Sequence, residues 1–284
     1  MTSDNAPWQP DSRSSGATNT GPNGLSDDQT GGTASFGFRD VKDTEKAGLV
    51  RGVFDSVATR YDLMNDLMSC GIHRIWKSIL IDRLHPQPGR CLLDMAGGTG
   101  DIADAYLRRA ASRPDAALKP TASAIVCDIN YKMLAAGLTR SQKTDHTCVM
   151  ARVCGNAESI PLANKSVDAY TISLGIRNVT HIDSALNEAY RVLKRGGIFV
   201  CLEFSHLITE GLQAAYDTYS FNVIPWLGEH VVGDRESYQY LVESIRRFPN
   251  QKAFARMIEE AGFQHVQYEN LTGGVAALHF GKKI

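Results

Sequence analysis

The sequence lacks the features that would point to a nucleic-acid-binding, membrane-spanning or metal-stabilised protein. Its 284 residues carry a formal net charge of −1, without the basic excess that nucleic-acid binding favours. No apolar run approaches the roughly 18 residues that a membrane-spanning helix needs, and the longest, Ile198 to Leu202, has the length of a strand. The six cysteines include no CxxC pair, and the eight histidines show no ligand spacing. We therefore expect no nucleic-acid partner, no metal, and buried, reduced thiols in a reducing compartment.

Residues 1–35 differ in composition from the rest of the chain. They are rich in Ser, Gly, Asp, Asn and Thr and hold few aromatic or branched apolar side chains. Such a segment cannot bury enough apolar surface to offset the entropy lost on ordering, so we expect a disordered tail. It lacks the apolar stretch of a secretory signal, and its only basic residue, Arg13, is unlike a mitochondrial presequence. The expected compartment is a bacterial cytoplasm, in preference to a mitochondrial matrix.

Residues 36–284 are expected to form one domain of the α/β class. Apolar residues at spacings of three and four predict a helical N-terminal cap over 44–85, which Pro86 and Pro88 end. Strand-like runs then alternate with helical segments, which predicts a mostly parallel, Rossmann-like sheet with helices on both faces. The seven expected strands are 90–95, 123–128, 147–154, 167–173, 197–204, 263–270 and 275–280. Glycines at 273 and 274 join the last two strands in an antiparallel hairpin.

A glycine-rich turn follows the first strand. Asp94 ends the strand, Asp101 begins a helix, and Gly97, Gly98 and Gly100 lie between them. Glycine allows close backbone approach and positive φ, and α/β sheets bind ligands at the carboxyl ends of their strands. The run that starts at Gly98 also fits the dinucleotide fingerprint G-x-G-x-x-A, so this spacing alone leaves NAD open. Against NAD, a carboxylate at the helix start would repel a pyrophosphate and suit the cationic groups of S-adenosylmethionine.

Polar residues also follow the second and third strands. Asp128 closes the second strand, where a carboxylate can accept the two hydroxyls of a ribose, and its alternative role is an N-cap for the helix starting at Asn130. Asn156 and Ala157 follow the third strand, where a side chain and a backbone N–H could read an adenine edge or simply form a turn. The three sites in this order favour a nucleoside ligand, and together with Asp101 they favour S-adenosylmethionine.

Several longer motifs resemble those of a known family. They are VFDSVA at 53–58, YDLMND at 61–66, GIHRIW at 71–76, LDMAGGTGD at 93–101, ISLGIRNV at 172–179, YRVLKRGG at 190–197 and LEFS at 202–205. On these residues the chain resembles the class I methyltransferases, and among them the C-methyltransferases of ubiquinone and menaquinone biosynthesis. The resemblance extends from about residue 36 to residue 283. The GIRNV and GIHRIW runs are the motifs most specific to that family.

The resemblance implies a cofactor, a substrate and a set of contacts. Its cofactor contacts fall at Thr99, Asp128, Asn156, Ala157 and Ser173, beside the turn residues Asp94, Gly98 and Gly100. The reaction it implies is methyl transfer from S-adenosylmethionine to a ring carbon of a polyprenylated benzoquinol, 2-polyprenyl-6-methoxy-1,4-benzoquinol. Some members of the family also methylate demethylmenaquinol.

Two residues after the fourth strand are the expected catalytic pair. A quinol ring carbon attacks a methyl group only when its hydroxyl loses a proton, so the enzyme must align the reactants and stabilise a phenolate. Arginine is a poor base, because its guanidinium group does not readily give up its proton. We therefore expect Arg177 to stabilise the oxyanion while a bound water accepts the proton. Asn178 would orient the hydroxyl. The alternative for both residues is helix capping and packing.

Two further questions stay open at the level of sequence. The aromatic segment Leu207 to Gly233 could line a prenyl tunnel or contact a membrane surface peripherally, or it could form core or a homodimer face. An NAD-dependent oxidoreductase, or a non-catalytic member of a quinone-biosynthesis complex, are the alternative functions. The joint presence of Asp94, Asp128, Arg177 and Asn178 argues against the non-catalytic protein.

Overall fold

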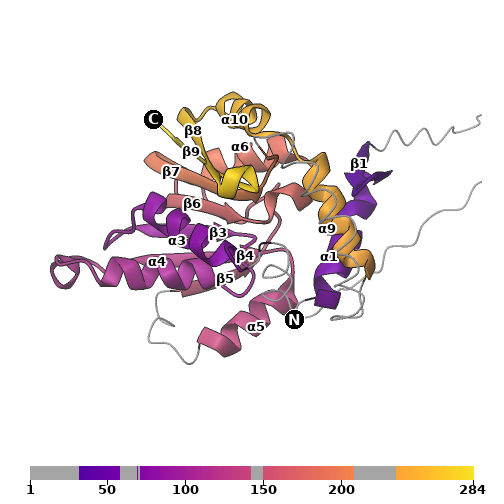
Figure 1. Cartoon of the computed structure of the whole chain (residues 1–284). Helices are drawn as coiled ribbons and strands as arrows, with labels where there is room; N and C mark the ends of the chain where they lie inside the picture. The colour runs from indigo at the N-terminus through magenta and orange to yellow at the C-terminus, as the bar shows by residue number, and fades with distance from the viewer. Residues whose placement is uncertain (1–31, 58–68, 70, 142–149, 208–234) are drawn as a thin grey trace, which may run out of the picture. The chain divides into compact units, whose positions relative to one another are not determined.

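A seven-stranded sheet organises the folded part of the chain (Figure 1). The computed structural model describes residues 32–57, 69, 71–141, 150–207 and 235–284, which belong to one structural unit, 31–284. The strands of this sheet are β3 (Cys91–Met95), β4 (Ser123–Asp128), β5 (Met150–Cys154), β6 (Val167–Ser173), β7 (Leu193–Phe204), β8 (Gln264–Leu271) and β9 (Ala276–Lys282). The α-helices are α1 (Asp43–Val57), α3 (His73–Leu84), α4 (Asp101–Ala111), α5 (Tyr131–Ser141), α6 (Ile182–Val192), α9 (Arg235–Arg247) and α10 (Gln251–Glu260).

The strand order is β5-β4-β3-β6-β7-β9-β8. The pairings from β5 to β7 are parallel, whereas β9 runs antiparallel to both β7 and β8. The 3-10 turn Thr272–Gly274 joins β8 to β9, with Gly273 at a φ of 67°. This arrangement confirms the mostly parallel sheet and its C-terminal hairpin. From β3 the chain continues to β4 and β5 on one side of β3 and then crosses to β6 on the other side. This reversal of strand order creates a switch point, where α/β sheets bind ligands.

Helices cover both faces of the sheet, as the alternating pattern predicts (Figure 1). Neighbouring strand residues point to opposite faces, so Leu92 enters the apolar cluster beneath α3 and α4, whereas Leu93 enters the cluster beneath α6 and α10. Trp76 on α3 packs edge-on against Phe204 at 5.9 Å between ring centroids, and its indole N–H donates to Thr272 Oγ1 at 2.9 Å. These contacts fix α3 beside the strand ends that form the site.

The N-terminal boundary of the folded part differs from the expected one. Residues Thr33–Phe36 (β1) pair antiparallel with Arg39–Lys42 (β2), so the last residues of the expected 1–35 tail form a strand instead. Phe36 explains the difference, because its ring is buried against α9 and gives the strand an apolar anchor. The strand β7 also begins before the expected residue 197, because Leu193 already pairs with Val167. Residues 1–31 lie outside the described part.

Three further expectations concern the cysteines, membrane-spanning helices and the aromatic segment 207–233. The described cysteines are free, and Cys127 and Cys201 are buried as expected, but Cys154 is exposed at the end of the edge strand β5. Among the described residues, no helix is both long and apolar enough to cross a membrane. The aromatic segment 207–233 lies outside the described residues except for Leu207.

Candidate active site

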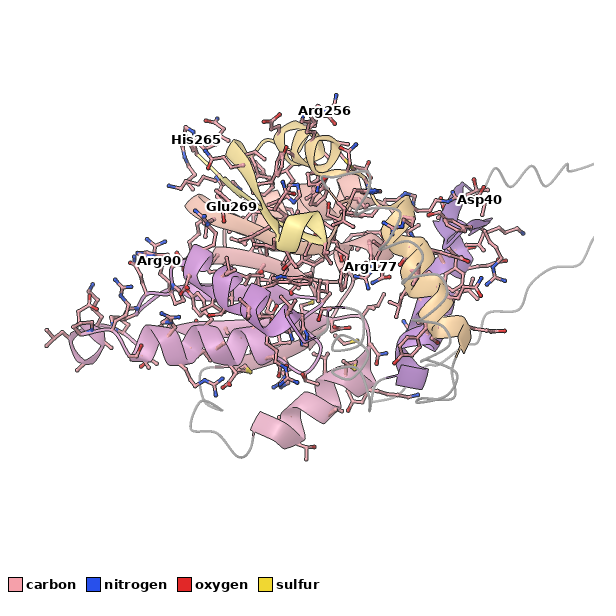
Figure 2. The ribbon with its side chains drawn as sticks, viewed as in Figure 1. Asp40, Arg90, Arg177, Arg256, His265 and Glu269 are labelled. Atoms are coloured by element: carbon pink, nitrogen blue, oxygen red, sulfur yellow. The ribbon has the colours of Figure 1, made fainter. Side chains whose placement is uncertain are left out.

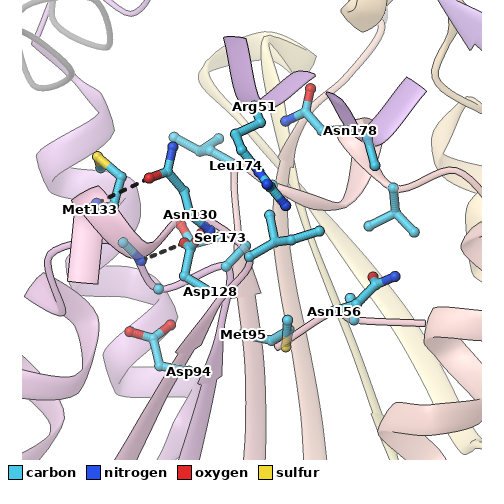
Figure 3. A pocket seen from close by; sticks show the side chains of 18 of the residues that line it. Arg51, Asp94, Met95, Asp128, Asn130, Met133, Asn156, Ser173, Leu174 and Asn178 are labelled. Atoms are coloured by element: carbon cyan, nitrogen blue, oxygen red, sulfur yellow. Dashed lines mark hydrogen bonds between the residues drawn. The ribbon is translucent and has the colours of Figure 1, made fainter. Parts of the chain in front are cut away.

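A cavity of about 400 Å³ opens at the carboxyl ends of the parallel strands (Figure 3). The loops after four neighbouring strands supply its floor, and helix α1 supplies a further wall. From the strand ends the lining includes Asp94, Gly97, Gly98, Thr99, Asp101, Asp128, Asn130, Asn156, Ala157, Ser173, Leu174 and Asn178; from helices it includes Asp43, Thr44, Ala47, Arg51 and Lys77. Most of the residues predicted from separate motifs therefore meet in one cavity.

The glycine turn is shaped by steric requirements. Gly98 has a φ of 55°, and a Cβ there would lie 3.1 Å from Met133 Cε. A Cβ on Gly97 would lie 2.8 Å from the Asp94 carboxylate, so only glycine lets the turn close over that side chain. Gly100 was expected to contact the cofactor, but it does not line the cavity. It instead forms the N-cap of α4 at a φ of 91°, where its lack of a side chain leaves space for Arg152.

Asp94 is a buried carboxylate with a free oxygen. Its Oδ2 accepts a hydrogen bond from Ala103 N at 3.3 Å, and its Oδ1 has no hydrogen-bond partner among the described residues. Only 1% of Asp94 is exposed. This burial raises the pKa of Asp94 to about 7. The cavity therefore contains an acceptor that a cationic ligand group would both pair and keep ionised.

Asp128 connects the glycine turn to β4. Its Oδ2 accepts from Gly98 N at 2.9 Å and its Oδ1 accepts from Asn130 N at 2.8 Å (Figure 3). Helix α5 is capped by Asn130, whose Oδ1 accepts from Lys132 N and Met133 N, so the capping role considered for Asp128 belongs to Asn130. Burial raises the pKa of Asp128. A carboxylate has about four acceptor positions, so Asp128 keeps capacity for ligand hydroxyls.

The remaining cofactor candidates lie around the same cavity. Asn156 is exposed and accepts from Glu158 N through Oδ1 at 3.1 Å, while the neighbouring Ala157 is buried. The Ser173 hydroxyl is buried and has no hydrogen-bond partner among the described residues. Thr99 donates weakly to Asp101 Oδ1 at 3.4 Å. All four candidates line the cavity, which is compatible with the contacts expected of them.

Arg177 does not face the cavity, contrary to its expected contact with the substrate oxyanion. Its side chain is 1% exposed and lies in the interior beside α9 (Figure 2). Its Nη1 donates to Glu203 Oε1 and to Leu174 O, both at 2.7 Å, and the guanidinium lies 5.6 Å from the Phe204 ring centroid. Glu203, at the end of β7, is also 1% exposed. The packing alternative considered for Arg177 is therefore the one that the structure supports.

Asn178, the next residue, does line the cavity (Figure 3). Its backbone N–H donates to Gly175 O at 3.1 Å within the 3-10 turn Ile176–Asn178. Its side-chain Oδ1 accepts from the Tyr240 hydroxyl at 2.9 Å. The expected catalytic pair is thus divided, with one side chain toward the core and the other toward the cavity.

Sequence reasoning missed three cavity or support residues. Arg51 projects from α1 into the cavity (Figure 3), and Lys77 on α3 lies 3.6 Å from Asp101 Oδ2. Apolar periodicity predicts the helices but does not show which polar side chains between the apolar positions face a ligand. Glu203 stood within the LEFS motif, and an acidic residue in an otherwise apolar strand is a signal of a buried partner.

The chain is similar to known methyltransferases. Residues 38–283 match the model of the ubiE/COQ5 methyltransferase family. The chain is 54% identical to a ubiquinone/menaquinone biosynthesis C-methyltransferase of Cereibacter sphaeroides, over 90% of this chain and 99% of the relative. It is also 54% identical to a mitochondrial 2-methoxy-6-polyprenyl-1,4-benzoquinol methylase of Oryza sativa, over 88% of each chain.

Solved structures show the fold. An S-adenosylmethionine-dependent methyltransferase of Aquifex aeolicus superimposes with a TM-score of 0.52 at 11% identity, covering 73% of this chain and 89% of that one. The [4+2]-cyclase SpnF superimposes with a TM-score of 0.60 at 14% identity, covering 82% and 94% respectively. The strand order and these likenesses confirm the predicted class I methyltransferase fold.

Proposed function

The chain belongs to the ubiE/COQ5 methyltransferase family, and we propose that it methylates a ring carbon of a polyprenylated benzoquinol with S-adenosylmethionine as donor. The acceptor we favour is 2-polyprenyl-6-methoxy-1,4-benzoquinol, with demethylmenaquinol as a second substrate. One observation carries the proposal: a relative of 54% identity is matched over 99% of its length, and residues of the LDMAGGTGD and GIRNV motifs of this chain border one cavity.

The residues of the cavity fit S-adenosylmethionine. When bound, this cofactor supplies an electrophilic methyl group on a sulfonium. Asp94 Oδ1, which lacks a partner among the described residues, would pair with the amino group of the ligand. Asp128 would accept the ribose hydroxyls, and Asn156 with the Ala157 N–H would contact the adenine edge. The glycine turn provides the close backbone approach, because side chains at Gly97 and Gly98 would collide with neighbouring atoms.

The substrate side of the cavity supports stabilisation of an anionic oxygen. Asn178 lines the cavity with a side-chain N–H group, and Arg51 adds positive charge from α1. Preorganised donors of this kind lower the free energy of a developing phenolate. Arg177 contributes by holding the turn that presents Asn178, since it joins Leu174 O to Glu203. A water molecule would accept the hydroxyl proton, because the amide of Asn178 is not a base and the side chain of Arg177 is buried away from the cavity.

We also propose a place of action. The polyprenyl tail is lipid-soluble, so the protein would collect its substrate from a membrane surface on the cytoplasmic side of a bacterial inner membrane. Flotation of the full chain with liposomes, with and without quinol, tests this, and absence from the lipid fraction in both cases would refute it. A homodimer and a quinone-biosynthesis complex remain predictions, to be measured by light scattering and co-purification.

Transfer of a radiolabelled methyl group tests the main proposal. The full chain is incubated with labelled S-adenosylmethionine and, in parallel, with a prenylated benzoquinol and a prenylated naphthoquinol kept reduced. We expect label on a ring carbon of the benzoquinol product, and Asp94→Asn should reduce it at limiting donor. Binding of NAD in place of S-adenosylmethionine, or no label in either quinol, would overturn the proposal.

A further inference from the structure

The side chain of Asn178 is held at one end and free at the other. Tyr240, from α9, donates its hydroxyl hydrogen bond to Asn178 Oδ1 at 2.9 Å. Asn178 Nδ2 is buried and has no hydrogen-bond partner among the described residues. Because Asn178 lines the cavity, the group that would meet a substrate there is the amide NH2. The carbonyl oxygen of this amide is already occupied by a residue of the protein.

Chemistry favours this orientation of the amide over the flipped one. Burial raises the pKa of Tyr240 above its usual value, so its hydroxyl keeps the proton that it donates. In the flipped orientation Nδ2 would donate to the oxygen of Tyr240 instead, and the phenolic hydrogen would lose the acceptor that Oδ1 provides. An unmade hydrogen bond on a buried group costs about 1–3 kcal/mol. The phenol therefore selects the amide orientation.

Tyr240 is itself fixed by the N-terminal hairpin. Its ring stacks on Phe36 of β1, with ring centroids 4.2 Å apart and an interplanar angle of 19°. The hairpin is tied to the same helix α9 at two further points, through Phe38 N to Glu243 Oε2 at 2.9 Å and through Arg247 to Asp40 at 3.2 Å. Figure 2 labels Asp40 at the end of this hairpin, beside α9. A chain of contacts thus runs from the hairpin to the cavity wall.

We propose that Tyr240 is a positioning residue, which fixes the Asn178 amide so that the substrate oxygen meeting it must be a hydrogen-bond acceptor. This inference rests on the proposed quinol methylation and adds the form in which the quinol is held, with an acceptor oxygen of the phenolate kind facing Asn178. It also gives Phe36 a part in the site, by supporting the ring of Tyr240.

Tyr240→Phe tests the positioning role, because the variant keeps the ring and its stacking on Phe36 and removes only the hydroxyl. We expect kcat to fall about tenfold, while the Kd for S-adenosylmethionine stays within twofold and the circular dichroism spectrum is unchanged. Tyr238→Phe is the matched control, since Tyr238 is a buried tyrosine of the same helix that packs in the cluster beneath α3. Its kcat should stay within twofold of the wild type. An unchanged kcat in Tyr240→Phe would overturn the inference.

A double-mutant comparison separates positioning from a structural effect. On an Asn178→Ala background the added Tyr240→Phe change should leave kcat within twofold, since no amide remains to be oriented. The same tenfold loss on both backgrounds would overturn the positioning role. Phe36→Leu should give a smaller loss of kcat that also disappears on the Asn178→Ala background.

Asn178→Asp tests the acceptor requirement directly. With one carboxylate oxygen bonded to Tyr240, the other would face the cavity in place of the amide NH2 and would repel an anionic ring oxygen. The ratio of variant to wild-type kcat should therefore fall as the pH rises and the quinol ionises, and a constant or rising ratio would overturn the inference. Methyl transfer by the wild type is measured alongside, and its absence would refute the proposed function. If the wild type transfers the methyl group but the effect of Tyr240→Phe does not depend on Asn178, only this inference is refuted.

Discussion

The protonation of Asp94 should make binding of S-adenosylmethionine dependent on pH. The pKa of this buried carboxyl is raised to about 7, so close to neutral pH a large fraction of the free protein carries Asp94 uncharged. A cationic amino group binds the ionised form, and the apparent Kd is the intrinsic Kd divided by the ionised fraction. That fraction is about 0.8 at pH 7.5 and about 0.1 at pH 6 for a pKa of about 7. The apparent Kd should therefore rise about eightfold over this interval, or about 1.3 kcal/mol.

Isothermal titration calorimetry at pH 7.5, 7.0, 6.5 and 6.0 measures this dependence. Asp94→Asn should bind about 10- to 100-fold more weakly at pH 7.5, from loss of a charge-assisted hydrogen bond, and should show a flat profile over the same range. Asp104→Asn is the control, because this α4 carboxylate pairs with Arg108 Nη2 and does not line the cavity. A wild-type Kd that stays within twofold from pH 7.5 to pH 6, or an Asp94→Asn profile parallel to the wild type, would refute the reasoning.

Three further predictions concern stability. Gly100→Ala should lower the free energy of unfolding in urea by about 1–2 kcal/mol, because φ is 91° there and the new Cβ would lie 3.0 Å from Arg152 Nη1, whereas Gly48→Ala in α1, with nothing within 4 Å, should not. Glu203→Gln should cost about 3–5 kcal/mol by leaving the Arg177 charge unpaired, and Arg177→Met with Glu203→Leu should recover most of it; equal losses in both would contradict this. Burial lowers the pKa of His279 to about 4, so the unfolded chain takes up its proton first as the pH falls below about 6.5. Stability should fall by about 2 kcal/mol from this residue between pH 7 and pH 5, and His279→Gln should remove that loss relative to the wild type in paired urea titrations.

The parts predicted well from the sequence are those that depend on local periodicity and chain order. Alternating strand and helix signals place Asp94, Asp128 and Asn156 at successive strand ends, and parallel strands necessarily bring those ends to one edge of a sheet. The residues that line the cavity at these strand ends could therefore be predicted from the sequence alone. The hydrogen bonds of these residues could not be predicted in the same way. Which residue caps α5, for example, depends on whether the side chain of Asp128 or that of Asn130 faces the helix N-terminus.

Arg177 shows where sequence reasoning stops. Arg177 and Asn178 are adjacent in a three-residue 3-10 turn, so their side chains point in different directions, and only one of them can face the cavity. Which one does so is decided by Glu203, which lies on the neighbouring strand and offers a buried carboxylate to the guanidinium. No spacing rule within the GIRNV motif contains that long-range partner. The strand β1 was missed for the same reason, since its anchor is Tyr240 on a distant helix.

The distribution of charge in the cavity follows the charges of the proposed reactants. The two buried carboxylates, Asp94 and Asp128, lie beside the glycine turn, where a cationic donor would bind. Two further carboxylates of the lining have partners: Asp43 Oδ2 lies 3.5 Å from His181 Nε2, although Asp43 Oδ1 has no hydrogen-bond partner among the described residues, and Glu158 accepts from Thr180 N. The Asn178 amide then offers its donor to an anionic oxygen. Methyl transfer from a sulfonium to a phenolate consumes one charge of each sign, so the Asn178 amide would bind the neutral methylated ring less tightly than the phenolate, whereas the amino group that Asp94 would pair is retained in the product.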